Sequence, residues 1–276
     1  MSQVSERETP GGPAPDGPDL ADPADNLRSF VRARASTGPE DTVVWWTGNV
    51  HSQAPGENHR HLFRFEGFNV GRMVEVDGGW RFLAREAAFY QDPRTGGILD
   101  SWTDPDTGAE HEVLHIWNDP VNQDLLLDGP RGPWRAPVTE VGGDVMWAQD
   151  ILLAYPSPLP VAAYPDNSAD DVYRAAELFQ FFCRRADLDA ADLPSVPCHF
   201  SWTRLAPWLP WMRRGARPGG LVYHCHGAKL GGYDELPEHL RKYVAAHDPR
   251  FAHSPEEWSA PNETSWTYFR KRHPQG

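Results

Sequence analysis

The sequence predicts a mainly β fold of the α+β type: a large antiparallel, barrel-like curled sheet of about ten strands with two or three helices. Glycine and proline number 24 and 27 in 276 residues, so turns are frequent and long helices few. From Thr42 onward, apolar side chains recur at every second residue, which is the period of a strand. A sheet of this size tends to curl or close, so we expect a barrel with one mouth plugged by a helix.

The N-terminal segment differs from the rest of the chain. Residues 1–24 are rich in proline and glycine and have almost no large apolar side chain, so we expect a disordered tail. Residues 25–276 are predicted to form a single domain. It would begin with a short helix over residues 25–35, capped by Asp25, with Leu27, Phe30 and Val31 on one face.

Seven segments then read as strands separated by turn residues. Short turns between successive strands predict an antiparallel meander. The segments are residues 42–50, 61–76, 79–90, 98–103, 111–119, 123–128 and 144–155.

The C-terminal half mixes both periods. Residues 171–186 repeat apolar side chains at helical spacing after a capping box of Ser168 and Asp171, which predicts a helix with Cys183 in its packed stripe. A second amphipathic helix is expected over residues 234–247. Three further strands are expected at 198–205, 219–230 and 264–272, the first followed by a stiff loop with Pro207 and Pro210.

Strand alternation places ionisable groups among aromatic side chains. Trp80, Phe82, Glu86 and Tyr90 share one face of their strand, and Trp202 and Arg204 share a face of theirs. A sealed core does not accept an unpaired charge. Glu86, Arg204, His115 and His224 are therefore paired, exposed to a wet cavity, or on the outer face.

These groups supply the candidate site. We expect Glu263 or His224 to act as general acid or base and Arg204 to orient a substrate oxygen, because burial beside tryptophan moves a carboxyl pKa toward neutrality. The catalytic candidates are Glu263, His224, Arg204, Glu86 and Tyr268. The candidates for substrate binding are Trp202, Trp208, Trp211, Trp266, His115, Trp117, Phe63 and Tyr90.

Other chemistries have weaker signals. The pairs His224/His226 and His59/His61 have metal-ligand spacing, with His115 or Glu263 as a third ligand, but such pairs are common in a chain with 12 histidines, and we predict no metal. Cys225 falls on the strand face opposite its flanking histidines, which disfavours a Cys–His dyad. Phosphate-binding glycine motifs are absent, so no cofactor is expected.

The chain resembles a known family in several long motifs: LFRFEGFNVGR, DPRTGGILDSW, NDPVN, YRAAELFQFF, FSWTRLAPWLPWM, YDELP and NETSWTYF. They are similar to those of DUF1838, a family of unknown function, and the resemblance spans about residues 26–270. It implies no particular activity and no catalytic residue.

Two functions remain open from the sequence. The first is a cofactor-independent enzyme of secondary metabolism, a cyclase or isomerase acting on an apolar substrate. The alternative is a non-catalytic, lipocalin-like protein that binds a hydrophobic metabolite. A net charge of −13 disfavours nucleic acid and anionic membranes as partners. We expect a cytoplasmic protein and a possible homodimer.

Overall fold

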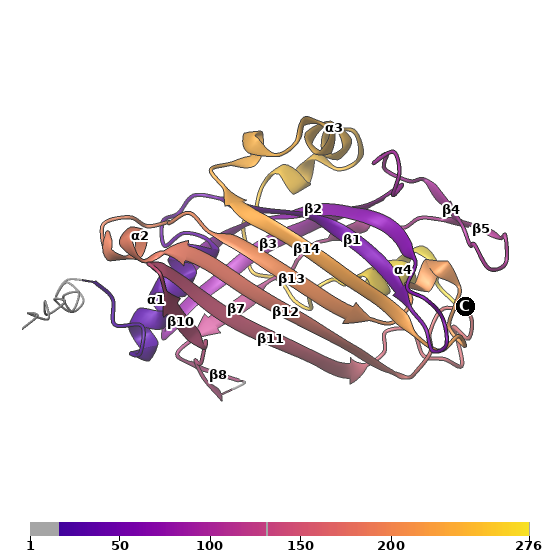
Figure 1. Ribbon diagram of the computed structural model, residues 1–276, viewed down its shortest axis with the longest axis horizontal. Helices are drawn as coiled ribbons and strands as arrows, with labels where there is room; N and C mark the ends of the chain where they lie inside the picture. Colours follow the sequence, from indigo (N-terminus) through magenta and orange to yellow (C-terminus); the bar gives the residue numbers. More distant parts are fainter. Residues whose placement is uncertain (1–16, 131, 276) are drawn as a thin grey trace, which may run out of the picture.

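A computed structural model describes residues 17–130 and 132–275 of the chain (Figure 1). Ten of its strands form one sheet in the order β10-β11-β12-β13-β14-β1-β2-β3-β6, and β7 also pairs with β3. Every pairing within this sheet is antiparallel. These strands are β1 (Thr42–Gln53), β2 (His61–Val76), β3 (Gly79–Gln91), β6 (Ile116–Asn118), β7 (Gln123–Leu126), β10 (Val138–Val141), β11 (Asp144–Pro156), β12 (Val172–Arg184), β13 (His199–Ala206) and β14 (Gly220–Leu230).

The predicted fold class is confirmed, but the sheet is curled rather than closed. Among the described residues, its two edges are β10 on one side and β6 with β7 on the other, and no ladder joins them. The expectation of a closed barrel was therefore wrong. Two hairpins lie outside the main sheet: β4 (Ser101–Thr103) with β5 (Glu110–Glu112), and β8 (Asp128–Gly129) with β9 (Gly132–Pro133).

The first helix, α1 (Pro23–Arg34), begins two residues before the predicted start. Its N-cap is Asp22, not Asp25, because the Asp22 carboxylate accepts hydrogen bonds from the N–H groups of Ala24 and Asp25. Residues 1–16 of the predicted tail lie outside the described residues. Leu20 is buried, so the packed part of the chain begins before residue 25.

In two segments of the C-terminal half, the predicted type of secondary structure was wrong. Residues 172–184, predicted as a helix, form strand β12, which pairs with β11 along its whole length and with β13. Residues 264–272, predicted as a strand, contain helix α4 (Ser265–Arg272), which Thr264 caps by accepting from the Thr267 N–H. The predicted helix at 234–247 is confirmed as α3 (Glu238–His247), and α2 (Arg185–Asp189) is short.

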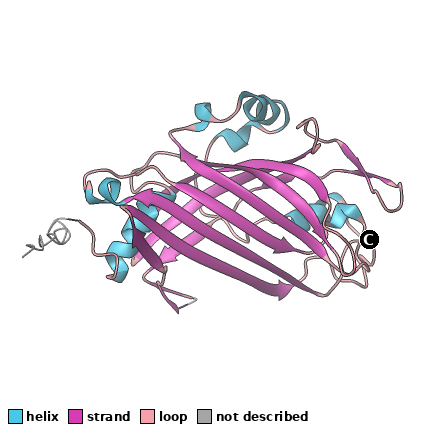
Figure 2. Cartoon of the chain, in the orientation of Figure 1, coloured by secondary structure: helices cyan, strands magenta, loops and turns pink. Residues whose placement is uncertain are grey.

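Apolar side chains cover both faces of the sheet. On the outer face, Leu240 and Val244 of α3 pack on Phe68, Val70 and neighbouring side chains of β1–β3. Burial of each such aliphatic side chain stabilises the fold by about 1.5–3 kcal/mol. Figure 1 shows α3 lying over this side of the sheet, with α1 and α2 at one end of the sheet and α4 at the other, and Figure 2 shows further short helical turns beside α3.

The inner face carries the larger core, in which Phe30 of α1 packs against Trp147 and Phe181 at one end of the sheet. A side chain at Gly227 would collide with the Phe200 ring, because a Cβ atom at this position would lie 2.6 Å from it. The ring of Phe200 can therefore lie across β14. Three single turns of 3-10 helix complete the fold: η1 (Pro210–Met212), η2 (Tyr233–Glu235) and η3 (Pro249–Ala252).

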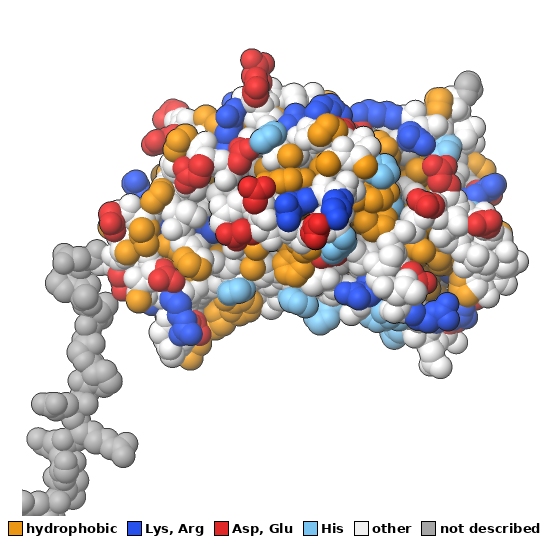
Figure 3. Space-filling model, turned by 90° about the horizontal axis from the view of Figure 1, so that it is seen from above, with side chains coloured by type: hydrophobic (Ala, Val, Ile, Leu, Met, Phe, Trp, Pro, Cys, Tyr) orange, Lys and Arg blue, Asp and Glu red, His pale blue; other side chains and the backbone are white. Residues whose placement is uncertain are grey.

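The surface seen from the side of α3 intersperses acidic, basic and histidine side chains with scattered apolar ones (Figure 3). Among the described residues, no helix has both the length and the apolar character needed to cross a bilayer.

Candidate functional site

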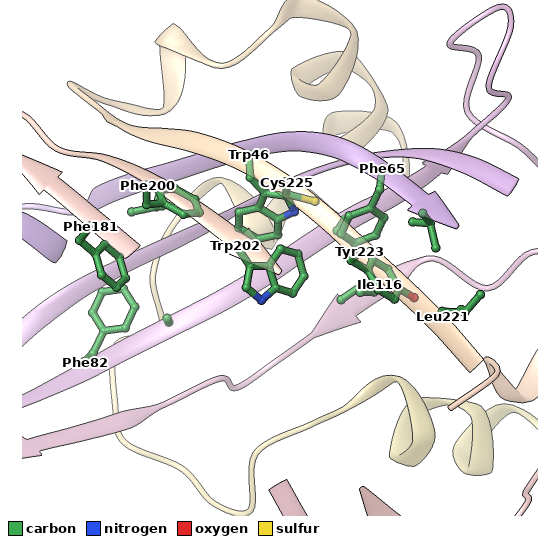
Figure 4. Packing of buried hydrophobic residues seen from close by; sticks show 14 of the residues in the cluster. Trp46, Phe65, Phe82, Ile116, Phe181, Phe200, Trp202, Leu221, Tyr223 and Cys225 are labelled. Carbon is green, nitrogen blue, oxygen red and sulfur yellow. The ribbon is translucent and has the colours of Figure 1, made fainter. Parts of the chain in front are cut away.

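The curled sheet encloses a cavity of about 270 Å³ on its inner face. Side chains from β1, β2, β3, β11, β12 and β13 line it, together with the segment before α4. Aromatic rings form much of the wall, and Figure 4 shows Trp46 of β1, Phe65 of β2, and Phe200 and Trp202 of β13 on this face. The rings of Phe179 and Trp202 are nearly parallel, with planes 13° apart and centroids separated by 5.9 Å.

A charged cluster lies within this aromatic wall. Arg204 of β13 forms an ion pair with Glu177 of β12, with 3.2 Å between Nη1 and Oε1, and it donates a hydrogen bond of 2.7 Å to the hydroxyl of Tyr173. The two strands pair with Glu177 directly opposite Arg204, so the register brings the charges together. Burial opposes the charge, but Tyr173, Glu177 and Tyr223 outweigh it and raise the pKa of Arg204 well above its ordinary value.

A second carboxyl group, Glu86 of β3, faces the same cavity without a direct cationic partner. Its oxygens accept hydrogen bonds from the amides of Asn69, at 3.3 Å, and Asn118, at 3.2 Å. Asn69 and Asn118 stand opposite Glu86 on the strands to either side. Burial, reinforced by the negative charge of Glu177, raises the pKa of Glu86 above its usual value.

Arg34, the last residue of α1, brings a second guanidinium group to the cavity. Its Nη2 lies 3.4 Å from Asn69 Oδ1, and its Cζ lies 5.0 Å from the centroid of the Phe82 ring. Burial lowers the pKa of Arg34 from its usual value, although arginine stays protonated in proteins.

The segment before α4 closes the side of the cavity between the two sheet edges. Asn262 accepts from the Asn122 N–H at 2.9 Å and donates to the Asn122 carbonyl at 2.8 Å, while the Glu263 N–H donates to the Pro120 carbonyl at 2.9 Å. Glu263 lines the cavity, but its carboxylate forms an ion pair with Lys271 on the next helical turns.

The comparisons with known proteins give the family. The family described as "Protein of unknown function (DUF1838)" matches residues 39–273. The chain belongs to this family. A search of the curated proteins found no match.

In this DUF1838 chain, the matched range contains both carboxyl groups and Arg204 but not Arg34, which precedes it. The cavity therefore combines residues of the matched domain with one cation from the preceding helix.

Four of the predicted site residues line the cavity: Glu86, Arg204, Glu263 and Trp202. Tyr90 and Phe63 lie on the same face of the sheet but beyond the cavity, packed against each other with ring centroids 5.4 Å apart. The Tyr90 hydroxyl lies 3.2 Å from that of Tyr223. These two residues belong to the core at the end of the sheet.

The tryptophans of the proline-rich loop do not line the cavity. Trp208 donates its indole N–H to the Arg217 carbonyl at 3.2 Å, and the Arg214 guanidinium lies 4.9 Å from its ring. Trp211 packs on Trp102 in the core. The loop is buried at one end of the sheet, and its two tryptophans lie away from this cavity.

Trp266 and Tyr268 were predicted to face a pocket from a strand, but both lie on α4. Trp266 packs behind the cavity wall, against the ring of Tyr173 at 4.7 Å between centroids. Tyr268 lies outside the cavity lining. Helical geometry turns these two side chains away from the arrangement that strand alternation predicts.

His115 and Trp117 also lie away from the cavity, in the cluster beneath α3. His115 Nδ1 accepts a hydrogen bond from the Tyr90 N–H at 3.2 Å. The pairing of β3 with β6 ends at Ala88, so this bond satisfies a backbone N–H of β3 that the pairing does not reach. Burial lowers the pKa of His115 to about 4, so the ring is neutral and can accept this hydrogen bond. Trp117 packs on Phe251 at 5.0 Å.

His224 projects from the outer face of β14, as does His226, and both are exposed. They stand opposite Asn49 and Thr47 of β1, on the far side of the sheet from the cavity. The structure therefore does not bring His224 to the other predicted catalytic residues. Within residues 17–130 and 132–275, no group of three or more His, Cys, Asp or Glu residues is arranged to hold a metal ion.

Sequence reasoning missed several polar residues of the cavity. Glu177 and Tyr173 were hidden because β12 was assigned as a helix, yet they alternate with Phe179 and Phe181 on one strand face. Asn69 and Asn118 could have been found as the cross-strand neighbours of Glu86 once the register was known. Nothing in the local sequence marks Arg34 as a cavity residue.

Proposed function

We propose that this chain is a cofactor-independent enzyme that performs acid–base chemistry, of the isomerase or cyclase type, on a largely apolar substrate in the aromatic cavity. The observation that supports this most is the presence of two partly buried carboxyl groups, in unlike surroundings, in one cavity. Glu86 is held by neutral amides and has a raised pKa, whereas Glu177 is paired with Arg204. Such a pair divides naturally into an acid and a base.

The roles follow from the surroundings of each group. Glu86, whose pKa burial raises, donates a proton to an oxygen or a double bond of the substrate. The faces of Trp46, Trp202 and Phe65 stabilise the positive charge that develops on carbon. The Glu177 carboxylate accepts a proton from another carbon, so the product is an isomer of the substrate and no other reagent is consumed.

A second candidate is the binding protein expected from the sequence. One observation favours it: the polar groups of the cavity already contact each other, since Arg204 is paired with Glu177 and Tyr173, and Glu86 with two amides. A site of this kind is preorganised to bind a ligand without transforming it.

Deuterium incorporation separates the two functions. The protein is incubated in D₂O with a panel of polycyclic and polyene metabolites, and each compound is analysed by mass spectrometry. An enzyme of the proposed type adds deuterium to its substrate or product, even where the isomers do not separate. A binding protein returns the ligand with unchanged mass.

Variants assign the role. Glu86→Gln keeps the shape of the side chain and removes the acid, so we expect deuterium incorporation to fall by about 10²–10⁴-fold. The matched control is Glu75→Gln, which changes an exposed glutamate of β2 and should have no effect. Undiminished incorporation in Glu86→Gln would exclude Glu86 as the acid.

The cytoplasmic location, the absence of nucleic-acid or membrane partners and the homodimer expected from the sequence stay predictions. Sedimentation of the purified protein would give its oligomeric state.

A further inference from the structure

The cavity has an excess of hydrogen-bond donors over acceptors among its unsatisfied atoms. Four buried donors of lining residues have no partner: Arg34 Nη1, Arg204 Nε and the indole nitrogens of Trp46 and Trp202. One buried acceptor of the lining is unsatisfied, Asn118 Oδ1. Buried donors without partners cost free energy, so the occupant that suits this cavity is rich in acceptors.

The charges around the cavity also indicate a ligand that is rich in hydrogen-bond acceptors. Glu177 is the counter-ion of Arg204, and Glu263 is the counter-ion of Lys271. Arg34 has no carboxylate within ion-pair distance among the described residues, and Asn69 lies between it and Glu86, with a hydrogen bond to each. One positive charge of the cavity is therefore left without a partner.

The remaining wall suits a flat apolar body. Phe179 is nearly parallel to both neighbouring rings, with plane angles of 13° to Trp202 and 13° to Phe181. Aromatic faces stacked in one layer bind planar rings or conjugated chains well. The volume of about 270 Å³ accommodates a body of two or three fused rings with one polar group.

We propose that the ligand of this cavity is an organic anion: an aromatic or conjugated body with a carboxylate whose oxygens are bound by Arg34. A carboxylate supplies several acceptor sites, enough to accept from the free Nη1 of Arg34 and from a further donor of the wall. The planar body lies against Phe179 and Trp202. This inference names the chemical class of the ligand of the proposed function. It rests on that proposal only in taking this cavity as the functional site, and it holds for an enzyme and for a binding protein alike.

Binding at equilibrium tests the inference without any turnover. The probes are 2-naphthoate and 2-acetylnaphthalene, which have the same ring system and similar size but differ in charge. Isothermal titration calorimetry at neutral pH should give an affinity for 2-naphthoate at least about tenfold higher than that for the ketone, as expected for charge-assisted hydrogen bonds. Equal affinities, or no binding of 2-naphthoate at millimolar concentration, would overturn the proposal.

Substitution of Arg34 locates the anion. Arg34→Met keeps the length of the side chain and removes the charge, so we expect it to weaken 2-naphthoate binding about tenfold and to leave the ketone unchanged. Arg34→Lys retains the charge without the planar fork and should be intermediate. The control is Arg64→Met, on the exposed side of β2. Unaltered 2-naphthoate binding in Arg34→Met, with the fold verified by circular dichroism, would also overturn the proposal.

The two proposals fail separately. If 2-naphthoate binds through Arg34 but no compound of the metabolite panel gains deuterium, the enzyme is excluded and the anion site stands. If a neutral substrate gains deuterium while 2-naphthoate does not bind, the acid–base proposal stands and the anion site is wrong.

Discussion

Arg204 is surrounded by aromatic rings, and its charge persists there because Glu177 lies directly across the strand pair. Removal of one member of a buried ion pair leaves the other charge uncompensated. The pair is partly buried, so we expect Arg204→Met to lower the free energy of unfolding by more than the about 0–1 kcal/mol of an exposed pair and by at most the about 3–5 kcal/mol of a fully buried one, and the double variant Arg204→Met/Glu177→Leu to recover most of this loss. Urea denaturation of the natural protein, the single variants Arg204→Met and Glu177→Leu, and the double variant gives the coupling free energy between the two residues.

The control for this cycle is an ion pair at the start of β12, the strand of Glu177. Arg174 and Asp170 form an exposed ion pair, and exposed pairs contribute about 0–1 kcal/mol. Arg174→Met should therefore have little effect on stability. If Arg204→Met and Arg174→Met were equally mild, the Arg204–Glu177 pair would contribute no more than an exposed ion pair.

Glu86 makes stability depend on pH in a definite direction. An unfolded glutamate ionises near pH 4.5, whereas folded Glu86 has a raised pKa and binds its proton to higher pH. Between these two values the folded state holds more protons, so its stability falls as pH rises. Glu86→Gln does not titrate, and we expect it to gain stability relative to the natural protein as pH increases from 4 to 8.

The expected gain is about 1.4 kcal/mol for every pH unit by which the folded pKa exceeds the unfolded one. Denaturation curves at several pH values measure this difference, and Glu75→Gln is the exposed control. A difference between Glu86→Gln and the natural protein that is constant with pH would show that Glu86 does not have a raised pKa.

Among the elements, β12 shows why the sequence could predict some of the site and not all of it. Its apolar residues fit a helical stripe through Val172, Ala176 and Phe179 as well as a strand face through Tyr173, Phe179 and Phe181. Local spacing cannot separate these alternatives, and pairing with β11 and β13 decides for the strand. Glu86 and Arg204 were found because their own strands alternate without such ambiguity.

The segment before α4 is an element whose role depends on a few hydrogen bonds. Asn262 joins Asn122 through two of them, and they hold the side of the cavity closed. We expect Asn262→Ala to increase amide hydrogen exchange at residues 259–264, including the Glu263 N–H that donates to Pro120, by about tenfold or more. Exchange in β12–β14 should not change.

Mass-spectrometric hydrogen exchange resolves this segment from the sheet. Asn49→Ala, which removes an amide from β1 opposite His224 on the outer face, is the matched control. Equal protection of residues 259–264 in the Asn262→Ala variant and the natural protein would mean that other contacts hold this segment.

For the whole molecule, the fold class, the strand alternation and the family follow from the sequence, while closure of the cavity does not. Whether the sheet closes on itself depends on long-range register and curvature, which a local period of two does not contain. The curled sheet instead leaves a gap between its edges that a distant segment, residues 262–265, helps to fill. Arg34 reaches the cavity by the same kind of long-range packing.

The three cysteines report how tightly the whole molecule is packed. Cys183, Cys198 and Cys225 are buried and free, and burial raises the pKa values of their thiols to about 12, 11 and 12. With a pKa of 12, the thiolate fraction at pH 8 is about 10⁻⁴, compared with roughly a quarter for an exposed cysteine. All three thiols should therefore be unreactive in the folded state.

We expect Ellman's reagent at pH 8 to label none of these thiols within minutes in the native protein and all three in denaturant. Cys225 lies on the central strand β14, and Cys183 lies on β12, nearer the β10 edge of the sheet. The labelling rates of these two thiols in low urea therefore compare local unfolding at the centre of the sheet with local unfolding near that edge. Cys183 should react before Cys225 if the sheet opens from its edge. Simultaneous reaction of all three would show that the sheet opens only by global unfolding, and rapid reaction without urea would contradict the packing described here.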